Sequence, residues 1–479
     1  MDPIASGPVL EPASGSYLQP SPSEPVFFPV SSAGIAVAPR RAKVAVRNTG
    51  RAAIRGSAGV ALFAALATIG FRLHELVPLV ANVLRPAMFL GPLAVVLMLR
   101  QAKVPFSAVV KRSFLLRALL ALAVFAAIGV PFALLRGFAF ARLQGLLPLF
   151  LLFLAFSLAK PSSADVKRAI TMFVILGGLL GTAAILLGHS DSSGRVSVTY
   201  TLDSNDLAAV LAMVVPLACG LVFSGSVYQR VGAVIAVAIC SWAIVRTGSR
   251  GGVVGLGVGL LVFVLIQRGS MRMISLAVLS LAMVVGWQFA PHSFRERMAS
   301  LASLEADYNT TSYFGRKEIW SRGIGYGLSN PVMGVGIGNF EAAEGSTLEE
   351  MGRRGKWSAA HNSFIQVFSE MGFPGLIIFS LILGRCLLVA WRWRSPRVFY
   401  PSEPSSYPGL LGAVTAFTVA AFFVSGAFSW AFFALCGLMS VADLSSNREG
   451  MTPPRRTGRA TLAPLLRKGA RIGKHKRPY

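Results

Sequence analysis

Four short polar clusters interrupt an otherwise apolar sequence, and their side chains are those that could do chemistry. In the first, Arg195 precedes the run Asp203-Ser204-Asn205-Asp206. Asp203 or Ser204 can cap a helix that begins near Asp206, whose carboxylate suits the positive end of that helix. An ordinary capped helix start explains these four residues without any further role. Arg195 needs another explanation, because it is a cation close to long apolar runs.

The second cluster combines a helix cap with arginines. Ser249 can cap the next apolar run, and the free amides of a helix start attract anions. Arg246 and Arg250 flank Ser249, and a guanidinium can grip a phosphate at two points. Binding is the favoured role for Arg250, because an arginine at the end of a membrane helix is costly unless it is used. Helix packing is the favoured role of the glycines that recur every fourth residue, Gly251, Gly255 and Gly259.

The third cluster runs from Tyr313 to Trp320 and is followed by a glycine-rich string at 330–340. This string lacks the preceding strand and the following Lys-Ser/Thr pair of a nucleotide-binding loop. We therefore expect a tight turn that lets the backbone approach the membrane or a ligand. Arg316 can bind an anion, or it can be a surface charge paired with Glu318 or Asp307.

The fourth cluster places a histidine at a predicted helix start. His361 precedes Asn362 and Ser363, either of which can cap the helix, and Glu370 follows two turns later. A histidine at a helix start is usually structural or simply exposed. The positive end of the helix should nevertheless lower the pKa of His361, which would keep the imidazole neutral and able to accept a proton. General base catalysis at neutral pH requires such a group.

Arginines and a base beside lipid suit a lipid-bearing pyrophosphate that is attacked by a hydroxyl. His189 and His292 have no set of neighbouring ligands, so no metal is assigned. No Ser-His-Asp or Cys-His arrangement follows from the spacing, and nothing in the sequence calls for a cofactor.

The composition indicates the setting of these clusters. Of the 479 residues, 54% are hydrophobic and only 14% are charged, which excludes a soluble enzyme. Apolar runs predict an all-α polytopic membrane protein with about twelve transmembrane helices. The predicted helices are 54–71, 79–99, 114–135, 143–159, 168–188, 206–224, 229–245, 251–267, 272–290, 363–391, 408–426 and 428–443.

The net charge of +26 is concentrated on one side of these helices. Lys and Arg gather in alternate loops and in both terminal segments, which predicts that both termini are cytoplasmic. No basic face interleaved with aromatic residues supports nucleic-acid binding. The basic tail is expected to contact anionic membrane lipid instead.

Three regions follow from this layout. Residues 1–52 form a Pro/Ser-rich, disordered and then basic cytoplasmic segment, 53–443 a membrane-embedded domain, and 444–479 a basic cytoplasmic tail. The long segment 291–362 faces outward, and we expect short helices at 312–328 and 341–351 within it.

The clusters also resemble the O-antigen ligase superfamily. The resemblance rests on the ordered motifs Asp-Ser-Asn-Asp-Leu-Ala, Thr-Gly-Ser-Arg-Gly, Gly-Arg-x-x-x-Trp, Pro-x-x-Gly-x-Gly and a His-Asn pair followed by Glu-x-Gly, between about 195 and 380. That family contains ligases that join O-antigen to lipopolysaccharide core, O-antigen and exopolysaccharide polymerases, and oligosaccharyltransferases that act on protein.

The resemblance implies a GT-C-like membrane fold and a metal-independent, inverting glycosyltransferase of the inner membrane. The donor would be a glycan on undecaprenyl diphosphate, and the acceptor a glycan or lipid A-core, with membrane lipid and other polysaccharide-assembly proteins as further partners. His361 matches the proposed base of the family, and Arg250 and Arg316 match its diphosphate-binding arginines. Arg195 and Arg246 are further candidates on position, and Asn205, Ser249, Asn362 and Glu370 would support the site.

Three alternatives stay open. The motifs do not separate a ligase from a polymerase. A transporter of a polyanionic lipid would place charged residues within many helices, whereas here they cluster at the outer helix ends and in one loop. A non-enzymatic scaffold would tolerate the replacement of His361.

Overall fold

The structure is a computed structural model that describes residues 54–102, 106–159, 162–199, 201–300, 312–353, 357–394 and 407–449. The chain divides into two units, Met1–Thr49 and Gly50–Tyr479, and every described residue belongs to the second. The predicted segment 1–52 and the tail beyond Glu449 therefore lie outside the described residues.

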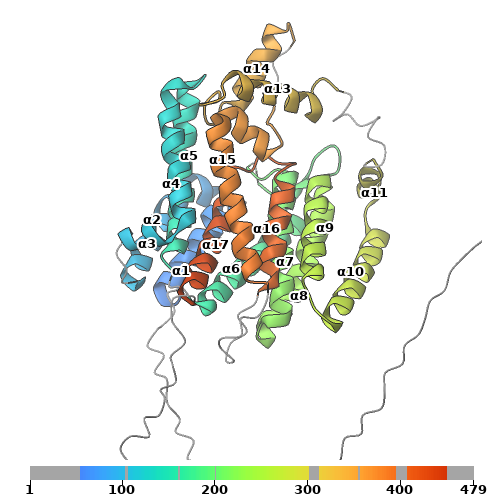
Figure 1. The fold of residues 1–479 in the computed structure, drawn as a ribbon. Coiled ribbons are helices and arrows are strands. Elements are labelled where there is room, and N and C mark those ends of the chain that lie inside the picture. The colour runs from blue at the N-terminus through green and yellow to red at the C-terminus, as the bar shows by residue number, and fades with distance from the viewer. Residues whose placement is uncertain are drawn as a thin grey trace, which may run out of the picture. The chain divides into compact units, whose positions relative to one another are not determined.

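Helices account for nearly all of the described structure (Figure 1). The first part contains α1 (Gly56–Ala65), η1 (Leu66–Gly70), η2 (Leu73–Leu76), η3 (Val80–Leu84), α2 (Ala87–Ala102), α3 (Phe106–Arg112), α4 (Phe114–Gly129), η4 (Val130–Phe132), α5 (Arg136–Ser157) and α6 (Ser163–Leu186). The strands β1 (His189–Ser190) and β2 (Val196–Ser197) then pair antiparallel. The remainder contains α7 (Ser204–Ser224), α8 (Val227–Thr247), α9 (Arg250–Leu265), α10 (Ser270–Phe289), α11 (His292–Ala299), α13 (Arg316–Ser329), α14 (Phe340–Glu350), α15 (Ser363–Arg392), α16 (Pro408–Ala420) and α17 (Trp430–Glu449).

Among the described residues, seven helices are long and apolar enough to cross a membrane: α4 with η4, α5, α6, α7, α8, α10 and α15. Five shorter apolar stretches lie at Gly56–Gly70, Ala87–Gln101, Arg250–Leu265, Pro408–Ala420 and Trp430–Ser445. Each of the twelve predicted ranges falls on one of these helices, and the prediction of an all-α polytopic membrane protein is confirmed. The number of crossings, the GT-C-like class and the cytoplasmic termini stay predictions.

The core forms around α7, which packs against α6, α8, α9 and α16. Small residues bring these helices close together, as predicted for the glycines of α9. A Cβ built at Gly255 would lie 2.8 Å from the Ala416 carbonyl oxygen, and one at Gly259 would lie 2.6 Å from that of Gly412. The backbones of α9 and α16 therefore touch, and larger side chains would separate them.

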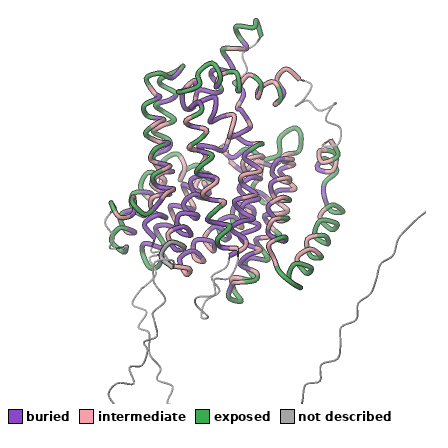
Figure 2. The backbone as a smooth tube through the Cα atoms, viewed as in Figure 1, coloured by how far each residue is buried: buried purple, intermediate pink, exposed green. Residues whose placement is uncertain are grey.

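Among the seven helices long enough to cross a membrane, α10 differs from the others, because none of its residues is buried against the protein (Figure 2). Its apolar side chains, among them Val278, Leu281 and Val284, are more than half exposed. In a membrane this surface would be covered by lipid.

Several helix ends differ from their predicted positions. α16 ends at Ala420, six residues before the predicted end, because residues 421–429 form turns that bond to the start of α15. α5 begins at Arg136 instead of 143, and Arg142 in this additional stretch of helix lines a cavity. α17 continues to Glu449, beyond the predicted boundary at 443.

Candidate functional site

The four polar clusters lie at helix starts, and the predicted caps are confirmed. The Asp203 carboxylate accepts hydrogen bonds from the amides of Asn205 and Asp206 at the start of α7, both at 2.7 Å. Ser249 Oγ accepts from the Gly252 amide of α9 at 3.2 Å. Asn362 Oδ1 accepts from the first amides of α15 at 2.9 and 3.1 Å. Each cap satisfies backbone donors that a helix leaves free.

The side chains of Arg195 and Ser249 both bind the side chain of Asn205. Arg195 donates from Nη2 to Asn205 Oδ1 at 2.8 Å and from Nε to the Thr247 carbonyl oxygen at 3.3 Å. Ser249 donates from Oγ to the same Asn205 oxygen at 3.0 Å. One amide oxygen therefore joins the loop before α7, the start of α7 and the start of α9.

Two further arginines lie beside this network. Arg250 donates from Nη1 to Ser300 Oγ at 3.1 Å, which links α9 to the end of α11. The Arg297 side chain of α11 lies next to that of Arg195 at Gly248, where a built Cβ would lie 3.3 Å from Arg297 Cδ and 3.6 Å from Arg195 Cγ. We call Arg195, Arg250 and Arg297 the arginine cluster.

The charges of the arginine cluster are close enough to affect one another. Burial of its guanidinium and the positive charges of Arg297 and Arg250 lower the pKa of Arg195, although the carboxylates of Asp203 and Asp191 oppose this shift. Like charges held together in this way favour the binding of an anion. Sequence reasoning missed Arg297. Its only signal is its place among the basic residues that follow Pro291 in the predicted outer segment.

His361 has an unusual backbone conformation directly before α15. Its φ of 49° lies in the left-handed region, which non-glycine residues rarely adopt. Its amide donates to Ser425 Oγ at 2.8 Å, and the next residues are held in the same way: the Ser363 amide donates to the Ala421 carbonyl oxygen at 2.7 Å. The structure therefore fixes the direction in which the imidazole leaves the backbone.

The segment 421–426 that holds His361 also contacts the helix that carries Arg250. A Cβ built at Gly251 would lie 2.4 Å from Phe423 Cβ, so this phenylalanine packs directly on the start of α9. Ser363 Oγ donates to the Val424 carbonyl oxygen at 2.8 Å on the other side. The start of α9 and the start of α15 are thus positioned by one segment, which was predicted to belong entirely to the helix 408–426.

Arg316 and Arg246 lie outside the set of contacts described so far. Arg316 is the first residue of α13, and Arg246 lies in the last turn of α8. α13 borders the histidine, since Trp320 Nε1 donates to the Ala360 carbonyl oxygen at 2.9 Å. Of the two ion-pair partners considered for Arg316, Asp307 lies outside the described residues.

Glu370 is buried and holds the glycine-rich turn. Its Oε2 accepts from the Gly338 amide at 2.8 Å, and its carbonyl oxygen accepts from the Gly336 amide at 3.0 Å. Gly334, Gly336 and Gly338 have φ values of 63°, 95° and 74°, which confirms the predicted tight turn. The role of Glu370 in these contacts is to position the turn against α15.

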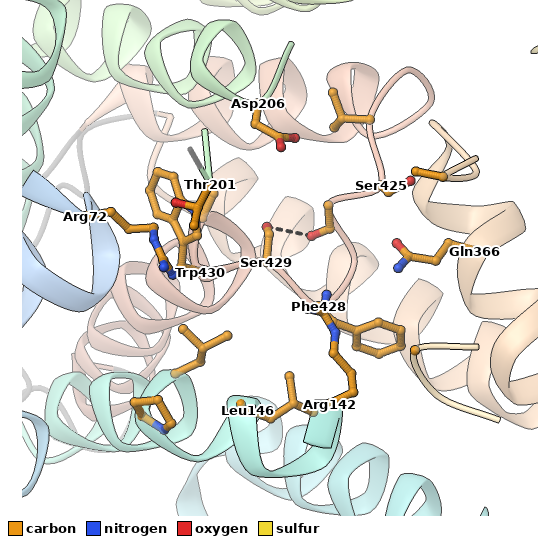
Figure 3. A pocket seen from close by; sticks show the side chains of 18 of the residues that line it. Arg72, Arg142, Leu146, Thr201, Asp206, Gln366, Ser425, Phe428, Ser429 and Trp430 are labelled. Carbon is orange, nitrogen blue, oxygen red and sulfur yellow. Dashed lines mark hydrogen bonds between the residues drawn. The ribbon is translucent and has the colours of Figure 1, made fainter. Parts of the chain in front are cut away.

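A cavity of about 800 Å³ lies beside His361 (Figure 3). Its walls include Ala360, which precedes the histidine, and Ser425, which accepts a hydrogen bond from the histidine amide. Asp206 and Glu370 also line it. Within the described residues, no group of three or more His, Cys, Asp or Glu side chains is placed to hold a metal ion.

The fold and the site define an integral membrane protein with an arginine cluster and a constrained histidine at the ends of its helices. Residues 235–380 match the family model described as O-antigen ligase. The match runs from α8 to the middle of α15 and includes Arg250, Arg316 and His361, whereas Arg195 and Asn205 precede it. It supports membership of the O-antigen ligase superfamily, so the predicted family is confirmed. No curated protein matches the chain.

The family whose model matches is one of glycan-transferring enzymes, and the match suggests a function in cell-surface glycan assembly. The substrates of such enzymes are glycans and lipid-linked glycans.

Proposed function

We propose that this protein transfers a glycan from undecaprenyl diphosphate to an acceptor hydroxyl on the outer face of the inner membrane. The observation that carries this proposal is that one segment of the chain positions both Arg250 and His361. The segment 421–426 contacts both the start of α9, which bears Arg250, and His361 before α15. A binding site for a diphosphate and a candidate base are thereby held next to the same segment.

The arginine cluster is the proposed diphosphate site. A diphosphate leaving group gains negative charge as its bond to the sugar breaks, and fixed cations stabilise that charge. Guanidinium groups suit this role because they bind phosphate oxygens at two points. Arg195 is held by Asn205 and Arg250 by Ser300, so both are oriented before a donor arrives. Arg316 and Arg246 are proposed to contact the donor from the neighbouring helices α13 and α8.

His361 is the proposed general base. The imidazole would accept the proton of the acceptor hydroxyl, and the oxygen would then attack the anomeric carbon of the donor sugar. The bond between that carbon and the diphosphate oxygen breaks, and its electron pair leaves with undecaprenyl diphosphate. Attack from the opposite face inverts the configuration at the anomeric carbon. Neither a metal nor a cofactor is needed to balance this step.

The exposed helix α10 supports a donor that arrives through the membrane. None of its residues is buried against the protein, so its side chains would face lipid in a membrane, and α11, which carries Arg297, follows within three residues. A polyprenyl chain in the bilayer could therefore lie along α10 while its diphosphate reaches the arginine cluster.

Purified protein in lipid, supplied with an undecaprenyl-diphosphate-linked repeat unit, tests the proposal directly. The reaction is run with and without a lipid A-core acceptor, beside His361→Ala and the exposed-histidine control His292→Ala. Transfer only when the acceptor is present identifies a ligase. A ladder of longer lipid-linked chains without the acceptor identifies a polymerase. The absence of any product that depends on His361 would contradict the proposal and favour transport or scaffolding.

A further inference from the structure

The cavity beside His361 has walls from elements that lie far apart in the sequence. They come from η1 and η2, from the first half of α5, from the start of α7, from the turn before α14, from α15 and from the connection between α16 and α17. The arginine cluster does not line it. A volume of about 800 Å³ is within the range of ligand-binding sites in proteins.

Two buried polar atoms on the cavity wall lack hydrogen-bond partners. Gln366 on α15 is 7% exposed, and its Oε1 has no partner in the protein. Figure 3 shows this side chain pointing into the cavity. His74 Nδ1, from η2 on the same cavity, is also buried without a partner. A buried polar group is costly unless something bonds to it, so both atoms indicate a polar occupant.

Arg142 brings a positive charge to the opposite wall, beside the carboxyl groups of Glu341 and Glu370. It lies on α5 and points toward the cavity in Figure 3. The stem of the arginine rests on Gly338, where a built Cβ would lie 2.8 Å from Arg142 Cβ. Glu341 lines the same wall, where burial raises its pKa although the positive charge of Arg142 opposes the shift. Arg72, the second arginine on the lining, is already paired with Glu75.

Aromatic rings accompany these polar groups. Phe138 of α5 lines the cavity and is about half exposed, and Trp357 packs edge-on against it with ring centres 5.8 Å apart. Thr201 and Ser429 add hydroxyl groups to the lining. Exposed aromatic faces suit the apolar faces of sugar rings, whereas amides, hydroxyls and a guanidinium suit their polar substituents.

We infer that this cavity binds a saccharide that carries an anionic group, a carboxylate or a phosphate, which pairs with Arg142. Gln366 and His74 would bond the sugar hydroxyl groups. The inference rests on the proposed function, because it places a glycan next to the proposed base. It adds a charge preference for that glycan and assigns it to residues separate from the diphosphate site. The saccharide belongs either to the acceptor or to the glycan of the donor.

Binding measurements on the full-length protein in nanodiscs test this inference without catalysis. The probes are a galacturonic acid trimer and its fully methyl-esterified form, which have the same skeleton and differ in charge. We expect the acid to bind at least about 10-fold more tightly, the ratio expected for about 1.4 kcal/mol from one charge-assisted hydrogen bond. Arg142→Gln should remove this difference, whereas Arg136→Gln, on the same helix but outside the lining, should retain it.

A second variant tests whether Gln366 binds the hydroxyl groups of the saccharide. Gln366→Leu should weaken the binding of both probes by a similar factor, because it removes a hydroxyl partner and no charge. Equal binding of the acid and the ester to the wild-type protein would overturn the inference. An unchanged preference for the acid in Arg142→Gln would overturn it as well.

Competition experiments identify the source of the saccharide and separate this inference from the proposed function. Displacement of the acid probe by an acidic acceptor glycan assigns the cavity to the acceptor, and displacement by an acidic glycan on undecaprenyl diphosphate assigns it to the donor. Displacement by undecaprenyl diphosphate without sugar would place the diphosphate in the cavity and overturn the inference. Binding of sugar-free undecaprenyl diphosphate that survives Arg250→Gln would instead contradict the proposed function alone.

Discussion

Arg195 Nη2 lies 2.8 Å from Asn205 Oδ1, and this oxygen also accepts a hydrogen bond from Ser249 Oγ at 3.0 Å. Asn205 is thus the shared acceptor for a cation and for the cap of the neighbouring helix. A side chain without that oxygen would leave the Arg195 guanidinium, which is already partly buried, without its side-chain partner.

Two replacements of Asn205 should therefore distinguish the loss of its hydrogen bonds from a change in the charge beside Arg195. Asn205→Leu removes the shared acceptor, and we expect a loss of about 1–3 kcal/mol in the free energy of unfolding, the cost of unpaired buried donors. Asn205→Asp retains the acceptor and should be milder in stability. Asn205→Asp should nevertheless weaken diphosphate binding, because its negative charge neutralises part of the arginine cluster. Thermal unfolding and binding of undecaprenyl diphosphate measure the two effects. Similar stability of the two variants would contradict the shared-acceptor role.

Arg250 and Arg316 should contribute more to donor use than basic residues outside the proposed diphosphate site. Arg250→Ala and Arg316→Ala should each reduce donor use, because each removes a cation from the proposed diphosphate site. Arg272→Ala is a matched control, since that guanidinium donates to the carbonyl oxygens of Leu265 and Gln267, at the other end of α9. Lys474→Ala in the tail should also be neutral. Steady-state turnover at varied donor concentration checks this, and an equal loss in all four variants would remove the assignment of the site.

Because the backbone of His361 is held in the left-handed region, replacement by Asn is more informative than replacement by Ala. Asn tolerates the left-handed conformation better than Ala, so His361→Asn should preserve the fold and remove only the base. We expect turnover to fall by about 10²–10⁴, the usual contribution of general base catalysis. The pH dependence of the residual activity should also lose its imidazole titration. Near-normal turnover of His361→Asn with an unchanged pH profile would show that the histidine is structural.

α15 is kinked at Gly372, where the backbone leaves the helical conformation, and this kink gives a prediction about stability. Gly372 has a φ of 61°, and a Cβ there would lie 2.3 Å from the Pro331 carbonyl oxygen. Gly372→Ala should therefore lower the free energy of unfolding by more than the 1–2 kcal/mol that the left-handed conformation alone costs. Gly384→Ala is the control, since a Cβ at that position of the same helix meets nothing within 4 Å. Comparison of thermal unfolding midpoints measures both, and equal midpoints would count against the described kink.

Glu341 should make stability depend on pH. Its pKa in the folded protein is raised above the ordinary value of 4.5 by burial at the cavity wall. The folded state therefore binds this proton more tightly than the unfolded state, and stability falls as the pH rises through that window. Glu341→Gln removes the effect, so the variant should be more stable than wild type at pH 7. The difference should disappear below about pH 4, and a difference that grows on acidification would contradict the raised pKa.

The sequence predicted the helices and caps well because both depend on local pattern. Apolar runs locate helices, and Asp203, Ser249 and Asn362 cap them as expected from residue type. The glycine-rich turn was predicted for the same reason, since few residues other than glycine adopt its backbone angles.

Contacts between distant segments could not be predicted in this way. Nothing near Arg297 in the sequence indicates Arg195 as its neighbour, and Ser425 was assigned to an apolar helix although it holds the His361 amide. Arg142 was likewise outside the predicted helix 143–159, because an arginine was read as the end of an apolar run. In the folded protein it faces a cavity instead, where its charge is tolerated.

The connection between α16 and α17 sets the distance from the proposed base to the proposed diphosphate site. Phe423 rests on Gly251 and Ser425 holds His361, with a single residue between them in sequence. An inserted residue at this point would change that distance, whereas the walls formed by α5 and η2 could vary without disturbing it. We therefore expect homologous enzymes with different sugars to diverge in those walls and to keep the length of the connection constant.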